Sequence, residues 1–125
     1  MSTVGELMTT EVVAVDPADT IGEAAERMVE RSCGSAVVLD YGRLIGILTE
    51  RDLLKAVAGR IHTSEARVRE WMTPDPVTVT RDTPAEEAAR HMLDGNFRHL
   101  PVVEDGQTVG VVSIRDVARW ATEES

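Results

Sequence analysis

Residues 46–53 read Gly-Ile-Leu-Thr-Glu-Arg-Asp-Leu, and residues 110–117 read Gly-Val-Val-Ser-Ile-Arg-Asp-Val. Both stretches have a glycine, a hydroxyl-bearing residue and an Arg-Asp pair at the same positions. We call the step from residue 46 to residue 110 the repeat offset. The same offset places Met8-Thr9 over Met72-Thr73 without a gap. Such a register is difficult to obtain by chance, so the sequence contains an internal repeat of two copies.

Further identities at the repeat offset fall on predicted strands, helices and turns. They are Val13 with Val77, Val15 with Val79, Glu23-Ala24-Ala25 with Glu87-Ala88-Ala89, Met28 with Met92, and Gly42 with Gly106. The offset is longer than the period of about 20–50 residues that is usual for solenoid repeats. Two copies therefore predict a pseudo-symmetric pair rather than an array.

Each copy predicts a lead-in helix followed by the order β-α-β-β-α. The first lead-in has capping-box spacing at Thr3-Val4-Gly5-Glu6, and its longer counterpart is predicted over residues 64–71. The predicted strands cover residues 12–15, 36–39 and 44–49 in the first copy and residues 77–79, 100–103 and 109–113 in the second. A glycine in each hairpin loop, Gly42 or Gly106, supplies the positive φ that a tight turn needs.

The helix after the first strand has an apolar face in both copies. In the first copy Thr20 and Glu23 have capping-box spacing, and in the second copy Pro84 precedes the helix. Apolar residues recur at helical spacing: Ile21, Ala24, Ala25, Met28 and Val29 in the first copy, and Ala85, Ala88, Ala89, Met92 and Leu93 in the second. Neither copy is large enough for a substantial core of its own.

Composition limits the class of protein. The 125 residues carry a net charge of −9 at pH 7, which disfavours nucleic acid as a partner because phosphate neutralisation needs a basic face. No apolar run approaches the roughly 18 residues of a membrane span, and the first residues do not resemble a secretory signal. The one cysteine, Cys33, cannot form an internal disulfide, so we expect a cytoplasmic protein.

With these residues in this order, the chain resembles the cystathionine-β-synthase (CBS) repeat pair, or Bateman module. The resemblance rests on Leu7-Met8-Thr9 and Trp71-Met72-Thr73, on the alanine-rich helices ending in Met, on the strand Phe-Arg-His-Leu-Pro-Val-Val at residues 97–103, and on the two closing motifs at 46–53 and 110–117. It implies an α+β fold of two tandem β-α-β-β-α repeats, residues 1–60 and 61–125, packed as a pseudo-twofold pair.

The resemblance also implies an adenosine-containing ligand in two clefts between the repeats. Asp52 and Asp116 would accept hydrogen bonds from the ribose hydroxyls, since a carboxylate presents two acceptor oxygens to a vicinal diol. Thr49 and Ser113 would offer hydroxyls to a phosphate beside a helix N-terminus. The other candidates are Arg51, Arg98, His99 and Arg115 for the phosphate, Thr9 with Val13 for one adenine, and Thr73 with Val77 for the other.

The carboxylates and the arginines also have structural explanations. Thr49-x-x-Asp52 and Ser113-x-x-Asp116 have the spacing of helix caps, although one carboxylate oxygen can cap while the other faces a ligand. Arg51 and Arg115 are equally explained as solvated residues of a first helical turn. Strand alternation points one residue of the Arg98-His99 pair inward, so a packed histidine explains His99 as well as a ligand contact does.

The two copies differ where a phosphate would bind. Residues 98–101 read Arg-His-Leu-Pro, whereas residues 34–37 read Gly-Ser-Ala-Val. We therefore expect the site at Asp116, Arg98 and His99 to bind phosphate better than the site at Asp52. Cys33 aligns with Phe97, which predicts a small buried thiol rather than a nucleophile.

No enzyme motif is found in the sequence. The three histidines lack metal-ligand spacing, no Ser or Cys lies in a nucleophile elbow, and no glycine-rich phosphate loop follows a strand. The sequence therefore predicts a non-enzymatic regulatory module with no catalytic residue, metal or required cofactor. It would sense AMP, ADP, ATP, S-adenosylmethionine or NAD as a homodimer and signal to a separate effector protein, without a nucleic-acid or membrane partner.

The alternative is an oligomerisation or protein-interaction scaffold whose nucleotide clefts are empty or vestigial. Its interface would use the apolar helix residues Leu53, Leu54, Trp71 and Trp120. A scaffold has no need of two hydroxyl-carboxylate pairs at matched positions, so their joint presence favours ligand binding.

Overall fold

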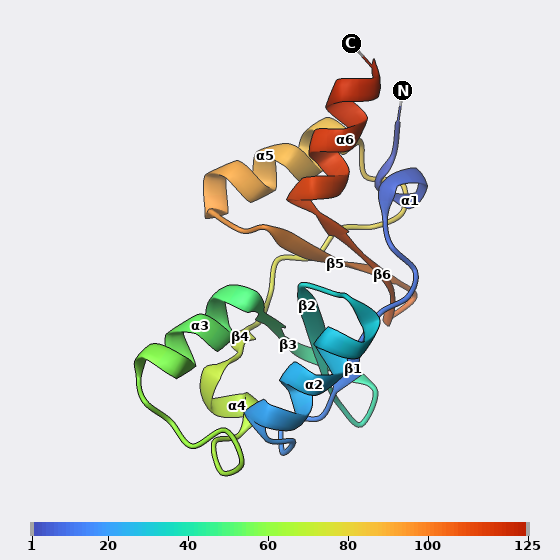
Figure 1. The fold of residues 1–125 in the computed structure, drawn as a ribbon. Helices are drawn as coiled ribbons and strands as arrows, with labels where there is room; N and C mark the ends of the chain where they lie inside the picture. The colour runs from blue at the N-terminus through green and yellow to red at the C-terminus, as the bar shows by residue number, and fades with distance from the viewer. Residues whose placement is uncertain (1, 125) are drawn as a thin grey trace. The chain divides into compact units, whose positions relative to one another are not determined.

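The computed structural model describes residues 2–124, without the side chain of Glu124, and confirms the predicted α+β class (Figure 1). The elements follow in the order α1 (Val4–Leu7), β1 (Ala14–Val15), α2 (Ile21–Arg31), β2 (Ser35–Asp40), β3 (Arg43–Thr49), α3 (Glu50–Ala58), α4 (Val68–Trp71), β4 (Thr73–Pro74), α5 (Ala85–Gly95), β5 (His99–Glu104), β6 (Gln107–Ser113) and α6 (Ile114–Glu124). Within the described part of the chain, no helix combines the length and the apolar character that a membrane span requires.

The chain forms two compact units. The central unit is residues 13–76, and the terminal unit combines residues 2–12 with residues 77–124. These bounds differ from those of the sequence repeats. The lead-in of the first repeat belongs to the terminal unit, which contains the rest of the second repeat, and the lead-in of the second repeat belongs to the central unit, which contains the rest of the first. We call residues 2–9 the first lead-in and residues 66–73 the second lead-in.

The central unit has a four-stranded sheet in the order β1-β2-β3-β4. β1 runs parallel to β2, and β3 is antiparallel to both of its neighbours, β2 and β4. β2 and β3 form the predicted hairpin. At the turn each strand is one residue longer than predicted, since β2 ends at Asp40 and β3 begins at Arg43. Tyr41 and Gly42 occupy its turn with φ of 51° and 80°, as a two-residue loop with two positive φ angles requires.

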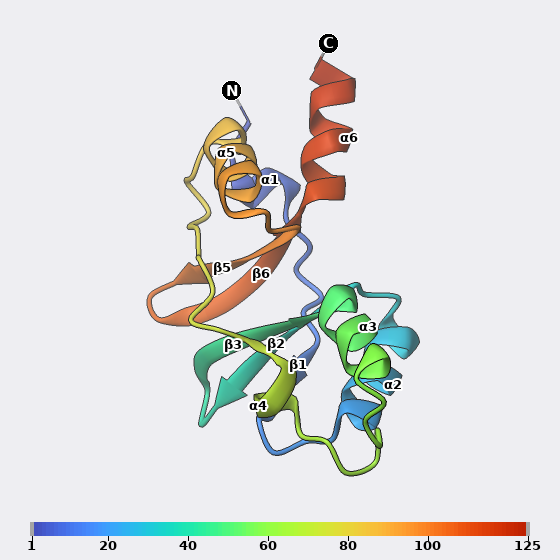
Figure 2. The same cartoon turned by 90° about the vertical axis from the view of Figure 1, so that its left-hand side faces the viewer.

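The terminal unit repeats this arrangement in reduced form. β5 and β6 form an antiparallel hairpin (Figure 2). Its turn, Asp105-Gly106, again has two positive φ angles. Single bridges replace the outer strands: Val79 pairs with Val102 in parallel, and Thr9 pairs with Val111 in antiparallel orientation. The strand predicted over residues 77–79 is therefore only a bridge at Val79.

The lead-ins dock through equivalent backbone bonds. At the repeat offset the paired bonds are Val4 N–H to Thr83 O (2.8 Å) and Val68 N–H to Asp19 O (2.9 Å), Gly5 N–H to Arg81 O (2.9 Å) and Arg69 N–H to Pro17 O (3.0 Å), and Ala85 N–H to Ser2 O (3.0 Å) and Ile21 N–H to Ala66 O (2.9 Å). The first lead-in is thus bound by the terminal unit as the second is bound by the central unit.

Two buried glycines allow the lead-ins to approach the sheets. A Cβ at Gly46 would lie 2.6 Å from Sδ of Met72, and a Cβ at Gly110 would lie 2.7 Å from Sδ of Met8. Since real Cβ atoms do not approach so closely, each methionine packs in space that only glycine leaves. Met72 thus packs against the central core and Met8 against the terminal core.

The helix predicted over residues 64–71 was too long, because α4 begins only at Val68. Ala66 O accepts the N–H of Ile21, and Arg67 N–H donates to the Glu70 carboxylate at 2.6 Å. These bonds hold Arg67 in extended backbone as the N-cap, with φ −98° and ψ 150°. The residues before it form turns instead of helix.

The apolar faces of α2 and α5 are narrower than predicted. Ile21, Ala24 and Met28 are buried on α2, and the equivalent residues are buried on α5. Val29 and Leu93 were predicted to face the core, but they are 78% and 76% exposed. At about 100° per residue Val29 lies roughly 80° around the helix from Ile21, at the rim of the buried stripe.

Candidate functional site

The first candidate carboxylate lies at the beginning of α3, in the central unit. Thr49 is the N-cap, and Asp52 Oδ2 accepts hydrogen bonds from the Thr49 N–H at 2.9 Å and from its hydroxyl at 3.1 Å. The Asp52 N–H donates in return to the Thr49 hydroxyl at 3.3 Å. Asp52 is only 7% exposed, so the cap fixes a largely buried carboxylate.

The second candidate carboxylate lies at the beginning of α6, in the terminal unit. Asp116 Oδ2 accepts the N–H of Ser113 at 2.8 Å, and the Asp116 N–H donates to the Ser113 hydroxyl at 3.1 Å. Asp116 is half-buried. The arrangement matches that at Asp52, and the predicted capping role holds at both positions.

Capping leaves part of each carboxylate available. Within residues 2–124, the capping bonds of Asp52 and Asp116 end on Oδ2, and neither Oδ1 is bonded. A carboxylate can accept more bonds than these caps use. Each Oδ1 is therefore a spare acceptor on a side chain that the cap holds in place, which is the chemistry that a ribose hydroxyl requires.

In the terminal unit, basic residues lie directly opposite the cap. His99 pairs with Ser113 across the hairpin, and the N–H of Ile114 donates to Arg98 O at 2.8 Å. Arg98 is exposed and His99 is half-buried, as strand alternation predicts for neighbouring residues. The structure thus brings Arg98 and His99 to the same end of the sheet as Ser113 and Asp116.

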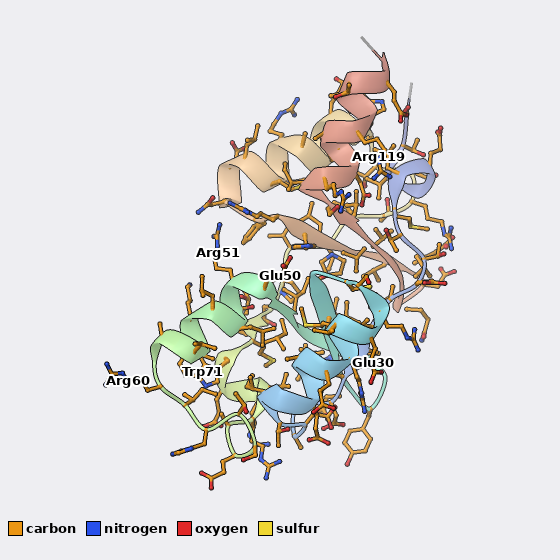
Figure 3. All side chains as sticks on the ribbon, in the orientation of Figure 1. Glu30, Glu50, Arg51, Arg60, Trp71 and Arg119 are labelled. Carbon is orange, nitrogen blue, oxygen red and sulfur yellow. The ribbon has the colours of Figure 1, made fainter. Side chains whose placement is uncertain are left out.

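In the central unit, the positions equivalent to Arg98 and His99 are the neutral residues Gly34 and Ser35. Ser35 pairs with Thr49, and the N–H of Glu50 donates to Gly34 O at 3.1 Å. Ser35 is 7% exposed, and Glu50 and Arg51 begin α3 on its exposed side (Figure 3). Ser35 and Glu50 were not predicted as site residues, although the alignment of Ser35 with the candidate His99 could have identified the first of them.

The lead-ins pass near both carboxylates. Thr9 pairs with Val111, two residues before Ser113, and Thr73 pairs with Ile47, two residues before Thr49. The structure therefore groups Thr9 with the Asp116 site and Thr73 with the Asp52 site.

The remaining candidate residues differ in how exposed they are. Val13 is 6% exposed with its side chain in the central core, and its carbonyl accepts the Val37 N–H at 2.8 Å. Val77 is 38% exposed at the boundary of the terminal unit. Arg51 and Arg115 are exposed residues of the first helical turns, and Cys33 is half-buried beside the central core rather than fully buried.

Comparison with known proteins identifies the repeats. The sequence profile of the CBS domain matches residues 4–59 and 68–123. A 17.7 kDa protein of Acidianus ambivalens, named from the bps2 3′ region, is 45% identical over 118 residues, which cover 93% of this chain and 71% of that protein. Two CBS domain-containing proteins of Arabidopsis thaliana, CBSCBSPB5 and CBSCBSPB4, are each 39% identical over 114 residues, which cover 90% of this chain but only about a fifth (21%) of those longer proteins.

Solved structures share the whole fold. CBSX2 of Arabidopsis thaliana, crystallised in complex with AMP, is 31% identical with a TM-score of 0.80, and the match covers 99% of this chain and 98% of that one. The CBS domain pair of protein MJ0100, in complex with 5′-methylthioadenosine and S-adenosyl-L-methionine, is 26% identical with a TM-score of 0.92 over 100% of this chain and 99% of that one. With two matched repeats, the tandem fold and the structural likeness in agreement, this chain belongs to the CBS domain family.

Proposed function

We propose that the chain is a non-catalytic regulatory module that binds adenine nucleotides or related adenosine compounds. Its two repeats, residues 1–60 and 61–125, act together, and each supplies one ribose-binding carboxylate. The observation that carries this proposal is the repeated cap, which fixes Asp52 and Asp116 through Oδ2 and leaves Oδ1 available. Relatives crystallised with AMP, and with methylthioadenosine and S-adenosylmethionine, support the ligand class.

The ligand would be held in three parts. Oδ1 of Asp52 or Asp116 accepts the ribose hydroxyls. The phosphate is bound by the helix N-terminus and the neighbouring polar and basic side chains, namely Thr49 and Arg51 in the central unit and Arg98, His99, Ser113 and Arg115 in the terminal unit. One adenine would lie against backbone near Thr9 and Val13, and the other against backbone near Thr73 and Val77.

The output of this module would be a change of shape that a partner reads. We propose a cytoplasmic homodimer whose ligand-bound conformation is recognised by a separate effector protein. A ligand shifts such an equilibrium only through its different affinities for the two conformations.

A thermal-shift screen tests the ligand class. Purified protein is heated with AMP, ADP, ATP, S-adenosylmethionine or NAD, with GMP and buffer as controls. A ligand at about 100 times its dissociation constant adds roughly 2.7 kcal/mol to stability, which raises the melting temperature of a domain this size by several degrees. Asp116→Ala should reduce this ligand-induced rise, whereas Asp94→Ala, at an exposed position on α5, should not.

A scaffold function is the second candidate, because apolar side chains are exposed on several helices. Val29, Leu54, Val57 and Leu93 are 63–78% exposed. Of the four interface residues predicted from the sequence, Leu54 is largely exposed, whereas Leu53, Trp71 and Trp120 are half-buried against the cores. A folded homodimer that no adenosine compound stabilises would favour the scaffold.

A further inference from the structure

The surroundings of Asp52 and Asp116 have the same backbone and different charges. Four positions around each carboxylate correspond at the repeat offset. They are Gly34, Ser35, Glu50 and Arg51 in the central unit, and Arg98, His99, Ile114 and Arg115 in the terminal unit. The hydrogen bonds described above place each set at the end of its hairpin, beside the helix cap.

Together with Asp52, the central set is acidic. Glu50 and Asp52 are negative and Arg51 is positive, so this end of the unit carries one net negative charge, because Gly34 and Ser35 are neutral. Glu50 also lies in the first turn of α3, where its carboxylate already compensates the positive end of the helix dipole. A phosphate placed here would meet like charge.

The terminal set is basic. Arg98 and Arg115 are positive and Asp116 is negative, so this end carries one net positive charge even with a neutral His99. Ile114, which is 37% exposed, stands at the position of Glu50, so the first turn of α6 has one acidic residue, Asp116, where that of α3 has two. The two ends thus differ by two charges on the same hydrogen-bonded frame.

We infer that the two sites select their ligands by charge: the Asp116 site binds a phosphate-bearing adenosine nucleotide, and the Asp52 site binds an adenosine compound without a phosphate. This inference rests on the proposed function. A phosphate monoester carries a charge of about −1.5 to −2 at neutral pH. It binds best to arginine and to helix N-termini with few acidic residues in the first turn. An uncharged nucleoside keeps the ribose bonds and avoids repulsion from Glu50.

Titration calorimetry with two probes, AMP and adenosine, tests this division. Asp52→Asn and Asp116→Asn assign each binding event to a site. AMP binding should be lost in Asp116→Asn and kept in Asp52→Asn, and adenosine binding should show the reverse. AMP affinity should also fall steeply as salt is raised, whereas adenosine affinity should change little, because only charged interactions are screened.

Exchanging the charges gives the sharper test. Arg98→Ser and Ile114→Glu should each weaken AMP about tenfold or more without changing adenosine binding, and Glu50→Ile should create measurable AMP binding at the Asp52 site. All three positions have exposed side chains, so the fold should tolerate the changes. Arg90→Ser, an exposed arginine on α5 away from both caps, is the matched control and should leave AMP binding unchanged.

The outcomes separate the inference from the function on which it rests. Equal AMP affinity at both sites, or an equal loss of AMP and adenosine binding in Arg98→Ser, overturns charge selection and leaves adenosine binding intact. If neither AMP nor adenosine binds to folded protein at millimolar concentration, the inference is wrong. The proposed function fails as well only if ADP, ATP, S-adenosylmethionine and NAD also leave the melting temperature unchanged.

Discussion

The central and terminal units have the same backbone scheme and different side chains. Each binds the lead-in of the other repeat through corresponding hydrogen bonds, and each places a capped aspartate at the end of its hairpin. Their cores, helix caps and site charges differ. Both units thus keep the hairpin, its buried glycine, the docked lead-in and the capped aspartate, while the side chains around them diverge.

The cores divide their volume differently across the hairpin. In the central unit Ala36 faces Leu48, whereas in the terminal unit the equivalent pair is Leu100 and Val112. All four residues are at most 1% exposed. Each unit thus has its larger residue on a different strand.

The largest expected effect comes from changing the size of the residue at these paired core positions. Leu100→Ala leaves a cavity beside Val112 and should lower the free energy of unfolding by about 2–5 kcal/mol. Ala36→Leu should overpack the central unit at a cost of about 1–3 kcal/mol. Urea denaturation followed by tryptophan fluorescence measures both, since Trp71 lies in the central unit and Trp120 in the terminal unit. A negligible effect of Leu100→Ala would contradict this account of the packing.

A second difference concerns the end of α5. A Cβ at Gly95 would collide with the ring of Phe97, whereas the central unit has Arg31 and Cys33 at these positions. Gly95→Ala should therefore cost about 1–3 kcal/mol from overpacking, although alanine recovers up to about 1 kcal/mol of helix propensity.

The same substitution should be harmless when residue 97 is small. In a Phe97→Cys background, Gly95→Ala should be neutral or stabilising, as Arg31 is tolerated beside Cys33. The four urea midpoints of this double-mutant cycle give the coupling energy. An identical cost in both backgrounds would show that the Phe97 ring is not the cause.

A smaller effect is expected at the start of α2. Thr20 caps this helix and accepts the Glu23 N–H at 3.1 Å, whereas the start of α5 has Pro84 without a side-chain cap. Thr20→Ala should lower stability by about 1 kcal/mol. Thr78→Ala, at an exposed position in the terminal unit, is the control, and an unchanged urea midpoint for Thr20→Ala would contradict the capping role.

The smallest effect depends on pH. The Thr20 backbone N–H and then its hydroxyl, both donating to Glu23, lower the pKa of this carboxyl below its ordinary value of 4.5. A lowered folded-state pKa gives stability that is present above the unfolded-state pKa and is lost as pH falls through the folded-state pKa. The melting temperatures of wild type and Glu23→Gln should therefore differ at pH 7 and converge in acid.

Glu87→Gln is the matched control for this experiment. The residue preceding α5 is Pro84, which has no N–H to donate to Glu87, so this substitution should produce no comparable pH-dependent difference. If the gap between wild type and Glu23→Gln widened in acid, the sign of the linkage would be wrong.

The sequence predicted the two hairpins, their neighbouring helices and the capped aspartates, but not the short strand β4 (Thr73–Pro74). The hairpin glycines, the capping pairs and the helical spacing are local signals, and they act over a few residues. The exchanged lead-ins could not be predicted in the same way, because the Met8-Gly110 and Met72-Gly46 contacts join distant parts of the chain. Repeat periodicity identifies equivalent residues, but it does not identify which copy each lead-in contacts.

The exposure of Val29 and the late start of α4 had tertiary causes. The helical period places Val29 at the edge of the apolar stripe, and only the extent of the neighbouring sheet decides whether that edge is covered. The bond from Ile21 to Ala66 competes with helix formation before Val68. Neither effect has a signal within its own stretch of sequence.

The most direct test of ligand binding at the capped aspartates is a backbone amide chemical-shift map recorded as AMP is added. If AMP binds at the Asp116 site, the largest changes should occur at the Ser113, Asp116 and His99 amides, with Thr9 also affected. The amides of Thr20 and Glu23 should be unchanged, because they belong to a helix cap without a proposed ligand. No change at saturating AMP, or changes confined to residues away from both capped aspartates, would contradict the central claim.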